Sequence, residues 1–150
     1  MQNIVGTWRL VRATSTAADG ATLPAPYGGG KGMGRVTLNG DGRMMAVLCD
    51  GRPTLPDGAA REYTSYCGNF TFDGKQLITR VDAASDADRL GTDQVRDVSF
   101  EGSLMVLRPP AKASGGVVQQ RVLYWEKVAE VSTRAAVARR RSVSLLPARP

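Results

Sequence analysis

The amino-acid sequence predicts an all-β protein, an eight-stranded antiparallel up-and-down barrel. Three features of the 150-residue chain support this prediction. Eight short runs of β-forming residues follow one another, and turn-forming Gly, Asp and Asn separate them. Nearly all successive runs are close enough to pair as hairpins. Only one segment in the body of the chain has the features of a helix.

The predicted strands are runs of apolar and β-branched residues, several of which alternate with polar ones. The connections Asn39-Gly40-Asp41-Gly42, Asp73-Gly74 and Glu101-Gly102 each join two runs. Asn-Gly and Asp-Gly are strong hairpin signals, because these residues tolerate positive φ. The eight runs cover residues 4–13, 33–38, 43–49, 66–72, 75–82, 94–100, 104–107 and 116–127.

The predicted helix covers residues 57–65, between the third and fourth strands. Pro56 precedes it, and Asp57 is a suitable N-cap. A second stretch of helical composition, residues 133–141, is rich in Ala and Arg and poor in apolar anchors. We therefore expect one barrel domain over residues 1–128 and a basic C-terminal tail, 129–150, that is a short helix or disordered.

Closure is expected because eight sequential strands would otherwise leave two exposed sheet edges. A closed barrel removes both edges, and a barrel of eight strands has room for one small ligand. A two-sheet sandwich is the alternative, but sequential hairpins favour the barrel.

The glycine-rich segment Gly28-Gly29-Gly30-Lys31-Gly32 is not expected to bind phosphate. It lacks the Gly-Lys-Ser/Thr ending and the following helix of a phosphate-binding loop. We expect instead a flexible flap over the mouth of the barrel.

The overall composition indicates a soluble globular domain, with 42% hydrophobic and 23% charged residues. No apolar run approaches the roughly 18 residues that a membrane-spanning helix needs. The first residues show neither the basic nor the apolar region of a signal peptide, so we expect a cytoplasmic protein. The two cysteines, Cys49 and Cys67, are then expected to be free thiols.

The net charge of +6 belongs mostly to the tail, where residues 128–150 contain five arginines and one glutamate. Nucleic acid is therefore not an expected partner of the barrel. The chain contains no histidine, which excludes His-based catalytic triads and most zinc or iron sites. We expect neither a metal nor a cofactor.

Four stretches of the chain resemble the lipocalin-like domain family of bacteria and fungi, which are small calycin-type barrels. Gly6-Thr7-Trp8 is similar to the Gly-x-Trp entry of lipocalins, and Gly91-Thr92-Asp93-Gln94-Val95-Arg96 is the more specific match. The stretches are residues 5–11 (VGTWRLV), 34–44 (GRVTLNGDGRM), 91–96 (GTDQVR) and 123–127 (LYWEK).

The resemblance implies a barrel fold more firmly than an activity. Some members of the family bind ligands, and a few calycin-type barrels catalyse cyclisation or isomerisation. Members often carry a histidine in the strand that corresponds to residues 77–82, where this chain reads Ile78-Thr79-Arg80-Val81. Chemistry that depends on that imidazole is therefore not expected here.

Alternation along the strands predicts which side chains face the barrel interior. A large aromatic residue at the barrel entry should point inward, which places Trp8 inside. In the last strand Arg121, Leu123 and Trp125 should also point inward, and Trp125 is an expected ligand-binding residue. We expect Arg121 to stack over Trp8 and to form the floor of the barrel with it, and a ligand role is the alternative for both.

Gln94 and Arg96 are the sharpest functional signal in the sequence. They share a predicted inward face with Val98, and an inward Arg is costly unless it is paired. Its partner is either a protein carboxylate, Asp82 or Asp93, or an anionic or carbonyl group of a ligand. Elsewhere on the inner wall, Tyr66 is expected to offer a hydroxyl and Thr79 a small polar contact.

We expect the cavity to bind a small, largely apolar or amphipathic molecule with an anionic or carbonyl group, met by Arg96 and Gln94. The alternative is a cofactor-independent isomerase, cyclase or hydratase. Arg96 would then stabilise an oxyanion, and Tyr66 or Asp93 would handle the proton. A third hypothesis is a protein–protein module with a filled barrel. The sequence leaves open whether the cavity also catalyses and whether the protein forms a homodimer.

Overall fold

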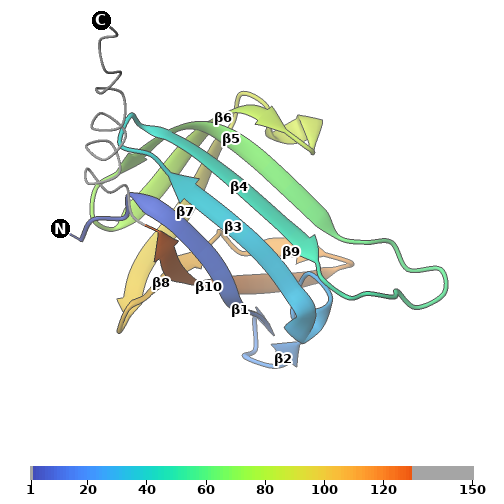
Figure 1. Ribbon diagram of the computed structural model, residues 1–150. Helices are drawn as coiled ribbons and strands as arrows, with labels where there is room; N and C mark the ends of the chain where they lie inside the picture. Colours follow the sequence, from blue (N-terminus) through green and yellow to red (C-terminus); the bar gives the residue numbers. More distant parts are fainter. Residues whose placement is uncertain (1, 130–150) are drawn as a thin grey trace, which may run out of the picture.

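The computed structural model describes residues 2–129, which form ten strands and two short 3-10 turns (Figure 1). The 3-10 turns are η1 (Gly29–Lys31) and η2 (Ala87–Arg89). The strands are β1 (Gly6–Ala17), β2 (Thr22–Leu23), β3 (Gly32–Leu38), β4 (Arg43–Asp50), β5 (Tyr63–Phe72), β6 (Gln76–Ala84), β7 (Asp93–Glu101), β8 (Leu104–Arg108), β9 (Lys112–Ser114) and β10 (Val117–Ala129).

Eight of these strands close into an antiparallel barrel. They neighbour one another in the order β1-β3-β4-β5-β6-β7-β8-β10, and β10 pairs back onto β1. The two remaining strands are short additions, with β2 on the edge of β1 and β9 beside β10. The predicted up-and-down barrel is therefore confirmed, and the sandwich is excluded.

The expected turn chemistry is present at the three tight connections. Gly42, Gly74 and Gly102 all adopt positive φ, between 59° and 95°. In the β5–β6 turn, the carboxylate of Asp73 accepts hydrogen bonds from the backbone N–H groups of Lys75 and Gln76. These local bonds fix the register of each hairpin, so the sequence between the strands decides which residues pair.

The predicted helix over residues 57–65 is wrong, because an irregular loop runs to Glu62 and β5 begins at Tyr63. Gly58 adopts a φ of 76°, which ends any helix that Asp57 could start. Tyr63 pairs with Cys49 of β4, so the sheet satisfies the backbone groups that a helix would have satisfied internally. Within residues 2–129 there is no α-helix. The expected helix at 133–141 and the rest of the tail lie outside the described residues.

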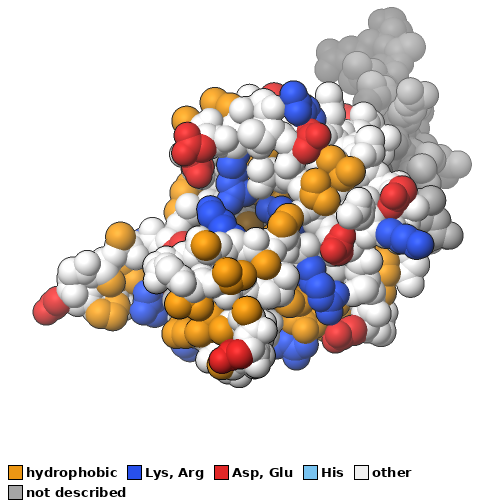
Figure 2. Space-filling view, turned by 180° about the vertical axis from the view of Figure 1, so that it is seen from behind, with side chains coloured by type: hydrophobic (Ala, Val, Ile, Leu, Met, Phe, Trp, Pro, Cys, Tyr) orange, Lys and Arg blue, Asp and Glu red, His pale blue; other side chains and the backbone are white. Residues whose placement is uncertain are grey.

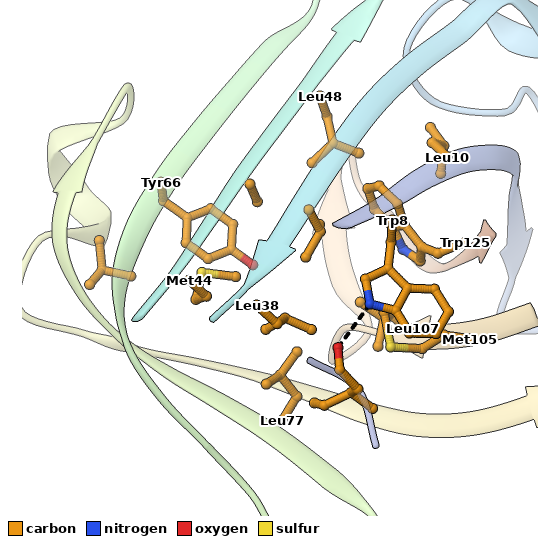
Figure 3. Close-up of a cluster of buried hydrophobic side chains, with 14 of the residues drawn as sticks. Trp8, Leu10, Leu38, Met44, Leu48, Tyr66, Leu77, Met105, Leu107 and Trp125 are labelled. Carbon is orange, nitrogen blue, oxygen red and sulfur yellow. Dashed lines mark hydrogen bonds between the residues drawn. The ribbon is translucent and has the colours of Figure 1, made fainter. Parts of the chain in front are cut away.

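The core fills the end of the barrel at which β1 begins. Trp8 is 3% exposed, and its indole N–H donates to the carbonyl oxygen of Ile4 at 2.9 Å (Figure 3). Leu38 and Met105 are fully buried around it. This packing closes one end of the barrel with side chains.

The Gly-x-Trp entry has a steric explanation at its glycine. Gly6 has a φ of 142°, and a Cβ there would lie 2.7 Å from the carbonyl oxygen of Ala129. Only glycine therefore allows β1 to approach the end of β10 this closely. Gly6 and Trp8 together form the seam at which the barrel closes.

Two expectations from composition can also be compared with the structure. In the part of the chain that is described, no helix is long and apolar enough to cross a membrane. Cys49 and Cys67 are both free thiols, as expected. They lie on β4 and β5, where Cys49 pairs with Tyr63 and Cys67 with Met45.

Candidate functional site

A pocket of about 750 Å3 occupies the other end of the barrel. Residues from seven of the eight barrel strands and from the loops around the open end line it. In Figure 2, Lys and Arg side chains gather around a hollow on the face that is shown. A pocket of this size is in the range of small-molecule sites, roughly 300–1,000 Å3.

The deep part of the pocket is apolar. Its wall consists of inward side chains that strand alternation places on one face, and most of them are buried. Contact with water is therefore unfavourable for this wall, and an apolar molecule would be favoured there. The wall residues are Val36, Met44, Ala46, Leu48, Leu77, Leu107, Leu123 and Trp125.

The rim of the pocket contains two arginines that share one amide. The side-chain oxygen of Gln94 accepts a hydrogen bond from Arg89 at 2.9 Å and another from Arg96 at 3.3 Å. Arg96 also donates to the carbonyl oxygen of Val95 at 2.8 Å. All three side chains are half-buried and line the pocket. One neutral oxygen thus holds two guanidinium groups close together.

A short chain of hydrogen bonds fixes the orientation of Gln94. Its amide nitrogen donates to the hydroxyl of Thr92 at 3.1 Å, and that hydroxyl donates to the carbonyl oxygen of Arg89 at 2.6 Å. The amide oxygen is consequently the end that faces the two guanidinium groups. The arrangement of the two guanidinium groups is therefore built before any ligand arrives.

Neither carboxylate considered as a partner of Arg96 is bound to it. Asp82 forms an ion pair with Arg43, which lowers the pKa of that carboxyl group through a side-chain hydrogen bond. Asp93 lies at the rim with its carboxylate 3.3 Å from Arg80, and both side chains are more than half exposed. Among the described residues, neither Arg89 nor Arg96 forms an ion pair, although the carboxylates of Glu62, Asp86, Asp88 and Asp93 also line the pocket.

Tyr66 stands beside the arginine pair. It is 8% exposed, and the guanidinium carbon of Arg89 lies 5.4 Å from its ring centroid. This cation–π contact orients Arg89 towards the pocket. Tyr66 is therefore a wall residue that also supports the rim.

The expected stacking of Arg121 on Trp8 is wrong. Arg121 forms a 3.2 Å ion pair with Glu62, and its guanidinium lies 5.8 Å from the ring centroid of Tyr27. Trp8 is covered instead by Lys127, at 5.2 Å. Arg121 and Lys127 point to the same face, but six residues separate them, roughly 20 Å along a strand. Strand alternation therefore predicted that Arg121 points into the barrel, but not how far along the barrel axis it lies.

Tyr27 forms part of the mouth opposite the arginine pair. It is 5% exposed and has a φ of 58°, an uncommon conformation for a residue other than glycine. The carboxylate of Glu62 holds it by accepting its backbone N–H at 2.8 Å. Tyr27 thus lines the mouth and is tied to the β4–β5 loop. Gly29, Gly30 and Gly32, from the segment expected to form a flap, lie beside β1 and do not line the pocket.

A buried ion pair anchors that loop. Asp50 is 1% exposed, and its carboxylate accepts hydrogen bonds from the guanidinium and the backbone N–H of Arg52. These bonds lower the pKa of Asp50. Arg61 adds hydrogen bonds to the carbonyl oxygens of Asp50 and Arg52. A Cβ at Gly28 would lie 2.2 Å from the Asp50 carboxylate, so the two loops touch here.

A comparison with protein families agrees with this architecture. The model of the family described as Lipocalin-like domain matches residues 5–128. The chain belongs to the lipocalin-like domain family. No curated protein matches it.

In this lipocalin-like domain, five of the predicted binding residues line the pocket: Tyr66, Gln94, Arg96, Arg121 and Trp125. Two others do not. Thr79 is 1% exposed on the inner face opposite Gln94, and Trp8 belongs to the closed end. Within residues 2–129, no three His, Cys, Asp or Glu side chains gather in a group that could hold a metal ion.

Tyr27, Glu62 and Arg89 are among the residues of the lipocalin-like pocket that were missed from sequence. All three lie in loops or at a loop end, where alternation gives no direction. The sequence contains one weak indication of the position of Arg89. Asp86 is a good N-cap residue, and it caps the 3-10 turn that ends at Arg89. That turn lifts Arg89 to the pocket rim.

Proposed function

We propose that this lipocalin-like domain binds a small, largely apolar molecule whose anionic or carbonyl group lies against Arg89 and Arg96. The observation that carries the proposal is the pair of guanidinium groups on the oxygen of Gln94, above an apolar pocket. Each group faces the pocket without a carboxylate partner in the described part of the chain. An anionic ligand group would supply that partner.

The chemistry of the pair supports an anion in particular. A guanidinium has five N–H donors, and those of Arg96 that bind Val95 and Gln94 leave others for a ligand. Charge-assisted hydrogen bonds are about twice as strong as neutral ones. Half-burial of both arginines reduces screening by water, which strengthens the attraction. The apolar wall below would take the rest of the molecule.

No specific observation favours the enzymatic alternative, an isomerase, cyclase or hydratase. It needs a proton-transferring group in the pocket. Asp93 lines the pocket, but its carboxylate lies 3.3 Å from Arg80 and its side chain is more than half exposed. Tyr66 remains as an acid, but no base stands within hydrogen-bond distance of it in the described residues. We therefore propose binding as the function of the pocket.

A pair of fluorescent probes tests the proposal: 8-anilinonaphthalene-1-sulfonate, which is anionic, and N-phenyl-1-naphthylamine, which has a similar apolar body and no charge. We expect the folded protein to bind the sulfonate more tightly. Arg96→Gln should weaken sulfonate binding about tenfold, because a charge-assisted hydrogen bond is lost, and should leave the neutral probe unchanged. Fluorescence titration gives both dissociation constants.

Arg9→Gln is the matched control, since it removes the same charge from the outer face, where Arg9 pairs with Glu126. It should leave both dissociation constants unchanged. Equal losses in the two variants would mean that only net charge attracts the probe, and the site would be wrong. Native mass spectrometry of the purified protein is the complementary search for a co-purified ligand.

A further inference from the structure

The deep wall of the pocket contains one polar atom without a partner. Trp125 is 1% exposed and lines the pocket, and its indole N–H is buried with no hydrogen-bond acceptor among the described residues. Unsatisfied buried donors are rare in native proteins and call for an explanation. Trp125 is the only described residue with a buried side-chain nitrogen or oxygen in this condition.

The neighbouring tryptophan shows that this condition is particular to Trp125. Trp125 pairs with Leu10 of β1, two residues from Trp8, and the two indoles are drawn next to each other in Figure 3. Trp8 donates to the carbonyl oxygen of Ile4 at 2.9 Å, and Figure 3 draws no such bond for Trp125. The two indoles lie on adjacent strands, but only that of Trp8 has a hydrogen-bond acceptor in the described part of the chain.

The walls beside Trp125 offer no acceptor of their own. Its neighbours in the pocket wall are aliphatic, and the far edge of its ring packs over Gly34, where a Cβ would lie 3.3 Å away. Gly34 leaves space for the indole but brings no polar side chain to it. The N–H itself is covered in the structure, so an acceptor from the pocket reaches it only when the indole turns or its neighbours move apart.

We propose that the ligand carries a second, neutral hydrogen-bond acceptor, a carbonyl or ether oxygen, that binds the indole N–H of Trp125. This inference rests on the proposed function, because it assumes that the anionic end lies at Arg89 and Arg96. The ligand class is then an amphiphile with two polar ends and an apolar middle. An anionic acceptor is not suited to the deep site, because no cation lines the wall there.

The strand register gives the spacing of the two ends. Val98 of β7 pairs with Leu107 of β8, which in turn pairs with Leu123 of β10. Arg96 lies two residues towards the rim from Val98, and Trp125 lies two residues deeper than Leu123. Four residues along a strand correspond to about 14 Å between the two backbone levels, measured along the strand direction. A chain of about ten to twelve carbons spans that distance.

Dodecanoic acid and its 5-, 8- and 11-oxo derivatives are suitable probes, because they differ only in the presence and position of a ketone. The chain contains two tryptophans, so a 15N–1H correlation spectrum shows two indole signals. We expect the acid whose ketone reaches Trp125 to move the Trp125 signal downfield and to move that of Trp8 little. It should also bind about fivefold more tightly than dodecanoic acid, as a neutral hydrogen bond predicts.

Trp125→Phe assigns the signals and removes the donor while it keeps an aromatic ring. In this variant the preference for the keto acid should fall to about one. Backbone-based assignment of the unmodified protein replaces the variant if Phe does not support folding, so the spectral test stands in either case.

Two outcomes separate this inference from the proposed function. If the four acids bind equally through Arg96 and the Trp125 signal moves alike with each, the second acceptor is wrong and the anion site stands. A buried water on Trp125 would give that result. If none of the acids binds, both the proposed function and this inference are overturned.

Discussion

Gln94 shows how one neutral side chain positions two arginines of the pocket. Its amide oxygen accepts from both Arg89 and Arg96, and its amide nitrogen is fixed by Thr92. Because the amide is neutral, it positions two cations without cancelling either. A carboxylate in the same place would satisfy the cations permanently.

Gln94→Glu tests this role, because the two side chains have nearly the same shape. We expect the variant to fold and to lose about tenfold or more in affinity for 8-anilinonaphthalene-1-sulfonate, since the new carboxylate occupies the two guanidinium groups. Affinity for N-phenyl-1-naphthylamine should not change. Unaltered sulfonate binding would show that the anion lies elsewhere.

Gly34 is a second residue that affects the pocket, because its lack of a Cβ leaves room for the neighbouring side chains. A Cβ there would lie 3.0 Å from the carbonyl oxygen of Val47 and 3.3 Å from both the Leu10 side chain and the Trp125 ring. Gly34→Ala should therefore reduce the free energy of unfolding by about 1–3 kcal/mol through overpacking. Gly40→Ala is the control, because nothing lies within 4 Å of a Cβ there. Urea denaturation measures both, and equal effects would contradict the packing at Trp125.

At the scale of the elements, alternation predicted strand faces well and loops poorly. Gly6, Trp8 and Leu10 face inward as expected, although the register of β1 shifts at Thr7/Trp8 and again at Leu10/Arg12. The predicted helix failed because Tyr63 and the residues after it are β-formers that pair with β4. Local capping signals at Asp57 were overridden by that pairing.

The loops hold the mouth in shape through a buried acid. The folded-state pKa of Asp50 is lowered, chiefly by the hydrogen bonds from Arg52. Asp50 therefore contributes stability above its unfolded pKa of about 3.9, and that contribution is lost as the pH falls through the lower folded value. This acid is bonded within the β4–β5 loop and packs closely against Gly28.

Asp50→Asn should remove this pH dependence. We expect the variant to be less stable than the unmodified protein near neutral pH, and its stability should change less between about pH 5 and about pH 2. Urea denaturation across that range measures the difference. Asp57→Asn, at an exposed position, should keep the slope of the unmodified protein. Parallel curves for Asp50→Asn and the unmodified protein would contradict the role of the ion pair.

At the scale of the whole molecule, the closed barrel separates a filled end from an open one. Trp8, Leu38 and Met105 fill one end, and the pocket occupies the other. The number and order of the eight barrel strands could be predicted from the turns, because most of the hairpins are local in sequence. The candidate site could be predicted from the sequence only in part. Gln94 and Arg96 lie on a strand and could be predicted, whereas Arg89, Tyr27 and Glu62 reach the pocket through loops that close only in three dimensions.

The most direct test of the central claim is a crystal structure of the protein with bound 8-anilinonaphthalene-1-sulfonate. The account predicts that the aromatic body lies in the barrel against the apolar wall and that the sulfonate oxygens accept hydrogen bonds from Arg89 and Arg96. A probe bound on the outer surface, or an interior filled by side chains, would contradict it.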